Sequence, residues 1–124
     1  MIEAIWTLEF VKGDKYHGAG VLIFANGRVY GGDANFYYIG RYAVNGGRVC
    51  IRTTVNSYNE DRTGDLVFGG RELFDIELAG QVADAQMVLA GAIVGEPSST
   101  VTAIAKRRHE IPDMRAAGEL ARTR

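Results

Sequence analysis

The sequence predicts an all-β protein built as a single antiparallel up-and-down β-barrel of about eight short strands. Polar and apolar residues alternate with period two along most of the 124 residues, and turns rich in Gly and Asn separate these stretches. Before the C-terminal region, no stretch of helix length repeats apolar residues at i, i+3 and i+4. A β-sandwich shares this pattern, but successive hairpins are the simplest connections and closure removes exposed strand edges, so we favour the barrel.

The alternation predicts strands, in chain order, at residues 3–11, 16–25, 28–30, 36–44, 48–58, 66–68, 72–80, 87–94 and 101–106. In the first strand the face that carries Trp6 is the more apolar one, so it should point into the barrel. In the 72–80 strand, the face that carries Phe74 should point inward, opposite Asp75 and Glu77. Those two carboxylates should therefore be solvated and are not expected to form a glycosidase-like pair.

Asn26-Gly27 is the strongest hairpin signal, because both central residues of a type I′ turn take positive φ. Further turns are expected at residues 13–14, 45–47, 83–84 and 96–99. Gly18 and Gly20 superficially look like a phosphate-binding loop, but a third glycine is missing and a strand follows instead of a helix. We expect them to mark a β-bulge, a bend or a close approach inside the barrel.

The size of the chain suits one domain with its own hydrophobic core. We expect the β-barrel domain to span residues 1–106 and a basic C-terminal tail to span 107–124. Pro112 and Gly118 interrupt any long helix there, so the tail should be flexible or form one short helix around Met114 to Leu120.

The net charge of −1 offers little counterion release, so direct binding of nucleic acid is not expected. The first residues lack the basic region of a signal or transit peptide, and no apolar stretch approaches the ~20 residues of a membrane span. Cys50 is the only cysteine and should be a buried or half-buried thiol in a reducing compartment. The predicted location is therefore the cytoplasm.

Catalytic chemistry is not expected. His17 and His109 are the only histidines, and neither accompanies a recognisable nucleophile. No spacing of Cys, His or carboxylates matches a zinc or calcium motif, so we predict neither a metal nor a cofactor. The chain is predicted not to be an enzyme.

The 36–44 strand carries bulky side chains on both faces, with Phe36 and Tyr38 on one and Tyr37 and Ile39 on the other. Either a second layer or a partner should cover the outer face. Since tyrosine is enriched at interface cores, we hypothesise a homodimer whose interface includes Tyr37 and Ile39.

The first half of the chain resembles the GrlR family, negative regulators of type III secretion gene expression. The resemblance covers residues 1–58 and rests on Ile5-Trp6-Thr7-Leu8 with Phe10, Gly18-x-Gly20-Val21-Leu22-Ile23, Asn26-Gly27, Gly31-Gly32-Asp33 and Tyr38-x-Gly40. It implies a lipocalin-like barrel with an apolar interior that dimerises. It further implies a regulator that binds a transcriptional activator, such as one of the helix-turn-helix type, and keeps it off DNA.

The resemblance also implies a contact loop between the fourth and fifth strands, where the founding member of the family carries an acidic run. Here Asn45-Gly46-Gly47-Arg48 occupies that place, so the same contact does not carry over. These four residues remain candidate partner contacts. Glu60 and Asp61, in the charged loop that follows residue 58, are the other candidates, although loop charges are commonly just solvated.

Two functions remain open at this point. The first is a regulator that acts through protein contact and sequesters an activator. The second is a carrier or sensor of a small hydrophobic ligand, because a barrel of about eight strands can hold one. The candidate cavity walls are Trp6, Leu8, Phe10, Phe74, Ile76 and Leu78. The same residues could instead fill the core.

Overall fold

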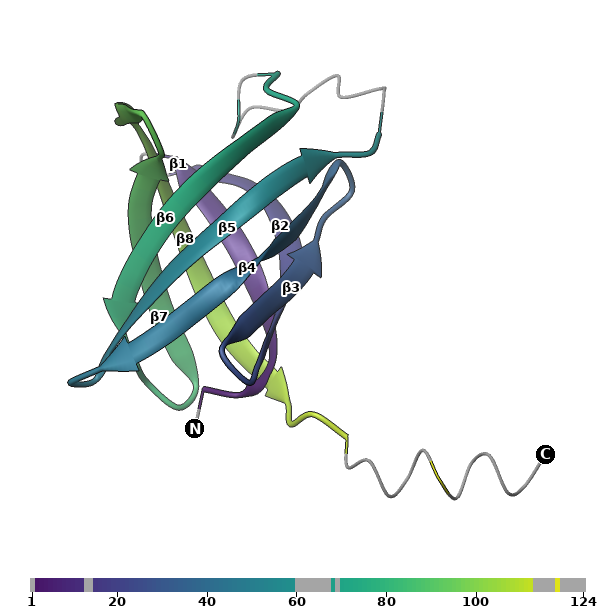
Figure 1. Ribbon diagram of the computed structural model, residues 1–124, viewed down its shortest axis with the longest axis vertical. Helices are drawn as coiled ribbons and strands as arrows, with labels where there is room; N and C mark the ends of the chain where they lie inside the picture. The colour runs from purple at the N-terminus through teal and green to yellow at the C-terminus, as the bar shows by residue number, and fades with distance from the viewer. Residues whose placement is uncertain (1, 13–14, 60–67, 69, 113–117, 119–124) are drawn as a thin grey trace.

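The computed structural model describes residues 2–12, 15–59, 68, 70–112 and 118, of which 12 and 15–17 are described by backbone alone. In these residues the chain forms a closed antiparallel barrel of eight strands, in which each strand pairs with the next and β8 pairs with β1 (Figure 1). The strands are β1 Ala4–Lys12, β2 Lys15–Ala25, β3 Arg28–Gly32, β4 Phe36–Asn45, β5 Arg48–Ser57, β6 Leu73–Gln81, β7 Gln86–Ile93 and β8 Glu96–His109. The predicted fold class is confirmed.

Period-two alternation decides which side chains enter the core. In β5, Val49, Ile51, Thr53 and Val55 are buried, and the residues between them face outward. The core is completed by apolar side chains from every strand and is rich in aromatic rings. Trp6 is fully buried, and its indole N–H is satisfied by the carbonyl oxygen of Ile2 at 2.9 Å. The inward direction predicted for the Trp6 face is therefore confirmed.

Two of the predicted turns show the expected chemistry, whereas the turn predicted at residues 13–14 lies outside the described residues. Asn26 and Gly27 have φ values of 50° and 78°, and Gly46 and Gly47 have 60° and 79°, as two-residue type I′ turns require. The bulge predicted near Gly18 is also present, because the β1–β2 register shifts between Glu9 and Val11.

The turn predicted at residues 96–99 is wrong. The chain reverses directly before these residues, at Val94-Gly95, where Gly95 takes a φ of 85°. Residues 96–99 already belong to β8, and the β7–β8 register shifts there, so Pro97 lies in an irregular stretch where its missing N–H breaks no regular ladder. β8 also continues past the predicted end at residue 106 as far as His109.

Phe68 closes the end of the barrel where β5 ends and β6 begins. Its ring is 1% exposed and packs edge-on against Phe10 and Phe36, with ring centroids 5.7 and 5.1 Å apart, and tilted against Phe74 at 5.0 Å. Arg71 donates to the Phe68 carbonyl oxygen at 2.7 Å through Nη1. The strand predicted at 66–68 is therefore not formed at Phe68, and its other two residues lie outside the described part of the chain.

Arg71 is itself fixed by Glu96 at the start of β8. Nη2 and Nε of the guanidinium lie 2.6 and 3.1 Å from the two carboxylate oxygens. This hydrogen bond to Arg71 lowers the pKa of Glu96 and raises that of Arg71. The bidentate pair thus ties the segment that carries Phe68 to β8.

The domain boundary predicted at residue 106 falls inside β8, which leaves the barrel only after His109 (Figure 1). The short helix expected around Met114 to Leu120 lies outside the described residues, apart from Gly118.

Candidate functional site

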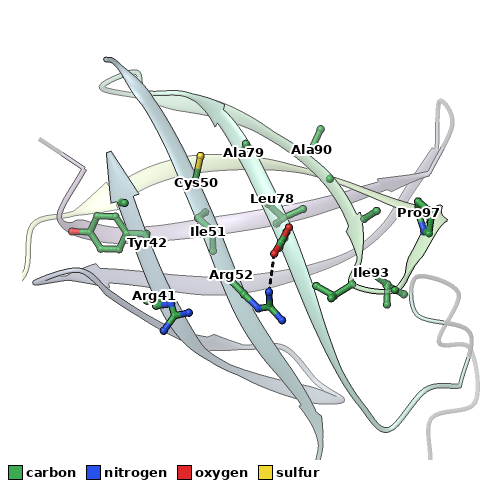
Figure 2. A pocket seen from close by; sticks show the side chains of 16 residues that line it. Arg41, Tyr42, Cys50, Ile51, Arg52, Leu78, Ala79, Ala90, Ile93 and Pro97 are labelled. Atoms are coloured by element: carbon green, nitrogen blue, oxygen red, sulfur yellow. Dashed lines mark hydrogen bonds and ion pairs between the residues drawn. The ribbon is translucent and has the colours of Figure 1, made fainter. Parts of the chain in front are cut away.

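An open hollow of about 760 Å³ lies on the outer face of the barrel over β4 to β7 (Figure 2). Its floor is a row of small side chains that pair directly across neighbouring strands, Ala43 with Cys50, Cys50 with Ala79 and Ala79 with Ala90. Figure 2 shows Cys50, Ala79 and Ala90 following one another across three strands. With so little side chain in the way, a partner can approach the sheet backbone closely. We call this surface the small-residue hollow.

Cys50 is exposed in this hollow, so the prediction of a buried or half-buried thiol is wrong. The reason is strand parity. Val49 and Ile51, on either side of it in β5, both enter the core, and the residue between them must face outward.

Beside the small-residue hollow, three arginines stand side by side on adjacent strands. Arg28 of β3 lies directly opposite Arg41 of β4, and Arg41 lies directly opposite Arg52 of β5. All three are exposed, and we call them the arginine row. Like charges directly opposite one another across a sheet are destabilising, so the fold gains nothing from this arrangement.

The arginine row is neutralised at one end. Arg52 forms ion pairs with Glu77 at 2.9 Å and with Asp75 at 3.3 Å, and the first of these is dashed in Figure 2. Within the described part of the chain, Arg28 and Arg41 form no ion pair. Arg41 also borders the small-residue hollow, so a positive charge that has no ion pair within the described residues stands directly beside an apolar floor.

A second hollow of about 600 Å³ continues from the arginine row toward β3. Its apolar walls are Tyr30 and Ile39, which are directly paired and 40% and 52% exposed. The arginine row therefore lies between two hollows with apolar walls, and Arg41 and Arg52 line both.

Arg41→Glu should stabilise the barrel by about 0.5–1 kcal/mol. The substitution replaces a repulsion between Arg28 and Arg41 by an attraction, and the new carboxylate can also reach Arg52. Urea unfolding followed by circular dichroism measures the change. Arg107→Glu alters the net charge equally at an exposed position away from the row and serves as the control. A less stable Arg41→Glu variant would contradict the expected cost of the row.

The lowered pKa of Asp75 predicts that part of the stability of the folded barrel is lost in acid. The hydrogen bond from the Thr54 hydroxyl, 2.7 Å long, lowers the pKa of Asp75 below its ordinary value of 3.8, and pairing with Arg52 lowers it further. Because the folded state depresses this pKa, the contribution is present above pH 3.8 and is lost as the pH falls through the folded value.

Asp75→Asn should therefore flatten the loss of stability below about pH 4, as measured by urea midpoints across the acid range. Asp84→Asn, which removes an exposed carboxylate from the β6–β7 connection, should follow the wild type. Equal acid sensitivity of the wild type and Asp75→Asn would contradict the assignment.

The residues predicted as cavity walls belong to the packed interior. Five of them are buried at 6% exposure or less, and Phe74 packs against the same core: they are Trp6, Leu8, Phe10, Ile76, Leu78 and Phe74. Aromatic rings pack toward both ends of the barrel. Phe68 occupies one end, and Phe24 packs between Trp6 and Tyr42 toward the other, with centroid distances of 6.2 and 5.0 Å.

The residues predicted for a dimer face are exposed. Tyr37 is 43% and Ile39 is 52% exposed, and no second layer of this chain's described residues covers them. Tyr58 lies beside Tyr37 with ring centroids 6.4 Å apart, and its hydroxyl donates to the carbonyl oxygen of Asp33. Tyr37 and Ile39 thus present exposed apolar surface on β4, and their role in a dimer stays a prediction.

Of the two candidate contact loops, only the one at residues 45–48 lies within the described residues. Asn45, Gly46, Gly47 and Arg48 form the exposed hairpin that joins β4 to β5, at the opposite end of the barrel from Phe68. Glu60 and Asp61 lie outside the described residues.

Within the described residues, no three Cys, His, Asp or Glu side chains gather as metal ligands would. The helices of the described chain include none with the length and apolar character needed to cross a membrane.

No protein-family model matches this chain, and no curated protein sequence matches it significantly. The resemblance to the GrlR family stays a prediction.

The arginine row is the feature that reading the sequence missed. Part of the signal was available, because a two-residue turn at Gly46-Gly47 pairs Asn45 with Arg48 and, four residues further along each strand, Arg41 with Arg52. The opposition of Arg28 and Arg41 depends on the β3–β4 connection. There Asp33 Oδ1 accepts backbone N–H bonds from Asn35 and Phe36 at 2.8 and 2.9 Å, which sets the register.

Proposed function

We propose that this chain is a non-enzymatic regulatory protein that acts by contact with another protein. The observation that carries the proposal is the contrast between the two sides of the barrel wall. The inside is packed with the protein's own apolar side chains, whereas the outside presents open hollows beside two arginines, Arg28 and Arg41, that form no ion pair within the described residues. A surface of this kind suits binding of a protein partner.

The resemblance of residues 1–58 to the GrlR family supports a more specific form of the proposal. In that form the chain sequesters a transcriptional activator of type III secretion genes in the cytoplasm and so acts as a negative regulator. The eight-stranded barrel agrees with the fold that the resemblance implies. The hairpin Asn45 to Arg48 lacks the acidic run, so we expect the contact to lie elsewhere on the surface.

We further propose that the chain forms a homodimer through the Tyr37 and Ile39 surface. Its exposed tyrosine and isoleucine side chains suit the apolar centre of an isologous interface. A strictly monomeric protein in sedimentation experiments at high micromolar concentration would refute this part.

The carrier function has less support. A hydrophobic ligand that entered the barrel from either end would meet packed rings, Phe68 at one end and the pair Trp6 and Phe24 toward the other, and each ring contributes strongly to the core. Native mass spectrometry of protein purified without denaturation separates the two functions. A bound hydrophobic mass would favour the carrier.

The test of the regulatory function is crosslinking and co-purification from the native cell. We expect a stoichiometric protein partner with a DNA-binding domain, and raised transcription of that partner's target genes when this chain is deleted. Recovery of no protein partner would refute the proposal, and a partner without DNA-binding character would refute the activator part of it.

A further inference from the structure

We infer that the small-residue hollow and the arginine row together form the docking site for one amphipathic helix of a partner protein, with carboxylates beside its apolar face. The inference rests on the proposed function, since it specifies the chemistry of the partner. It follows from three properties of the surface: its charge, its floor and its width.

The first property is the positive charge of the arginine row. Arg28 and Arg41 oppose each other, neither forms an ion pair within the described residues, and their mutual repulsion contributes nothing to the fold. A partner that brings carboxylates to this position would relieve the repulsion. On a helix, two residues four apart are about 6 Å apart along the axis, and arginine side chains on neighbouring strands about 4.8 Å apart can both be reached from that spacing.

The second property is the floor, which determines the side chains that the partner helix can place beside those carboxylates. The row Ala43, Cys50, Ala79 and Ala90 offers aliphatic contact and no polar side chain deep in the small-residue hollow. Glu77 is engaged by Arg52, so the acid on this face already has a partner. The floor therefore suits the apolar side chains of a helix seated in a groove.

The width of the floor matches a single helix. Four neighbouring strands span about 14 Å at the usual inter-strand spacing, and a helix with its side chains is about 10–12 Å across. A nucleic acid strand fits the site less well. The one ring among the residues that line the small-residue hollow, Tyr42, packs against Phe24 in the core, and the carboxylates of Glu77 and Asp75 lie beside Arg52.

The test measures binding of designed helical peptides of about 18 residues by fluorescence anisotropy. One labelled peptide has a Leu and Ala face flanked by Glu, the second replaces each Glu by Gln, and the third by Lys. We expect the wild-type protein to bind the Glu peptide about 10-fold more tightly than the Gln peptide, with the difference shrinking as salt is raised.

Two variants separate the charge from the floor. Arg28→Glu/Arg41→Glu should lose about 10-fold in affinity for the Glu peptide and gain affinity for the Lys peptide, whereas the control Arg107→Glu/Arg108→Glu should retain the wild-type order. Ala79→Phe, which fills the hollow, should weaken binding of the Glu and Gln peptides alike. Circular dichroism and urea unfolding verify that every variant is folded.

The inference is overturned if the wild-type protein binds no peptide up to about 1 mM, or does not distinguish Glu from Gln. It is also overturned if a single-stranded oligonucleotide or phosphatidylserine vesicles bind more tightly and lose that binding in the Arg28→Glu/Arg41→Glu variant. A dimer that this variant dissociates in sedimentation would assign the face to a second copy of the chain. These outcomes leave the co-purification result standing, so failure of the docking site and failure of the regulatory function are distinguishable.

Discussion

Phe68→Ala should destabilise the barrel by about 3–5 kcal/mol. The ring is nearly inaccessible and lies in contact with Phe10, Phe36 and Phe74, so its removal leaves a void that these rings cannot fill without leaving their strands. Typical domains are stable by only about 5–15 kcal/mol, so the loss is a large part of the total. Urea unfolding monitored by circular dichroism and by Trp6 fluorescence gives the value.

The matched control for this variant is Leu73→Ala. Leu73 also lies at this end of the barrel, in the first position of β6, but it is 69% exposed. Its truncation should change the stability by less than about 0.5 kcal/mol. If Phe68→Ala were no more damaging than Leu73→Ala, Phe68 would not be part of the core.

Gly91→Ala should lower the free energy of unfolding by about 3 kcal/mol. In the extreme case the variant would no longer unfold cooperatively. A Cβ at this position of β7 would lie 1.7 Å from the carbonyl oxygen of Glu77 in β6, which is a backbone atom that cannot rotate away. The β6–β7 ladder runs only from the Ile76–Ile93 pair to the Ala79–Ala90 pair. Because the clash falls within this short ladder, we expect it to loosen the closure of the barrel.

Thermal unfolding followed by circular dichroism checks this prediction. Gly118→Ala is the control, because a Cβ there meets no atom within 4 Å and its backbone does not take positive φ. Unchanged cooperativity and midpoint in Gly91→Ala would show that the two strands can separate enough to accept a methyl group.

The elements that sequence reasoning predicted well are those set by local rules. Alternation correctly predicted that Trp6 points inward and Glu77 outward, and the pair Asn26-Gly27 correctly predicted a turn. Each of these features depends on neighbouring residues alone. Cys50 could have been assigned correctly by the same rule. Its exposure follows from its place between Val49 and Ile51, and the general tendency of cysteine to be buried was the weaker argument.

The misplaced turn at residues 96–99 and the misplaced strand at residues 66–68 share one cause. Pro97 suggested a turn, but the reversal occurs at Gly95 and the β7–β8 bulge accommodates the proline. Phe68 looked like part of a strand, but its ring contacts Phe10 of β1 and Phe36 of β4, which are distant in sequence, as well as Phe74 of the neighbouring β6. In both cases non-local pairing overrode the local preference.

The sequence by itself determined that this protein is an antiparallel all-β protein, for which it favoured a barrel, and it determined which face of each predicted strand is apolar. Only the tertiary structure decided that β8 pairs with β1 and that Arg28 lies opposite Arg41. It also decided that Phe68 packs into the end of the barrel where β5 ends and β6 begins. The physical reason is that side-chain alternation is a property of one strand, whereas closure, plugging and cross-strand charge opposition depend on register between strands. The candidate docking surface belongs to the second group, since it is assembled from β3 to β7 and exists in none of them alone.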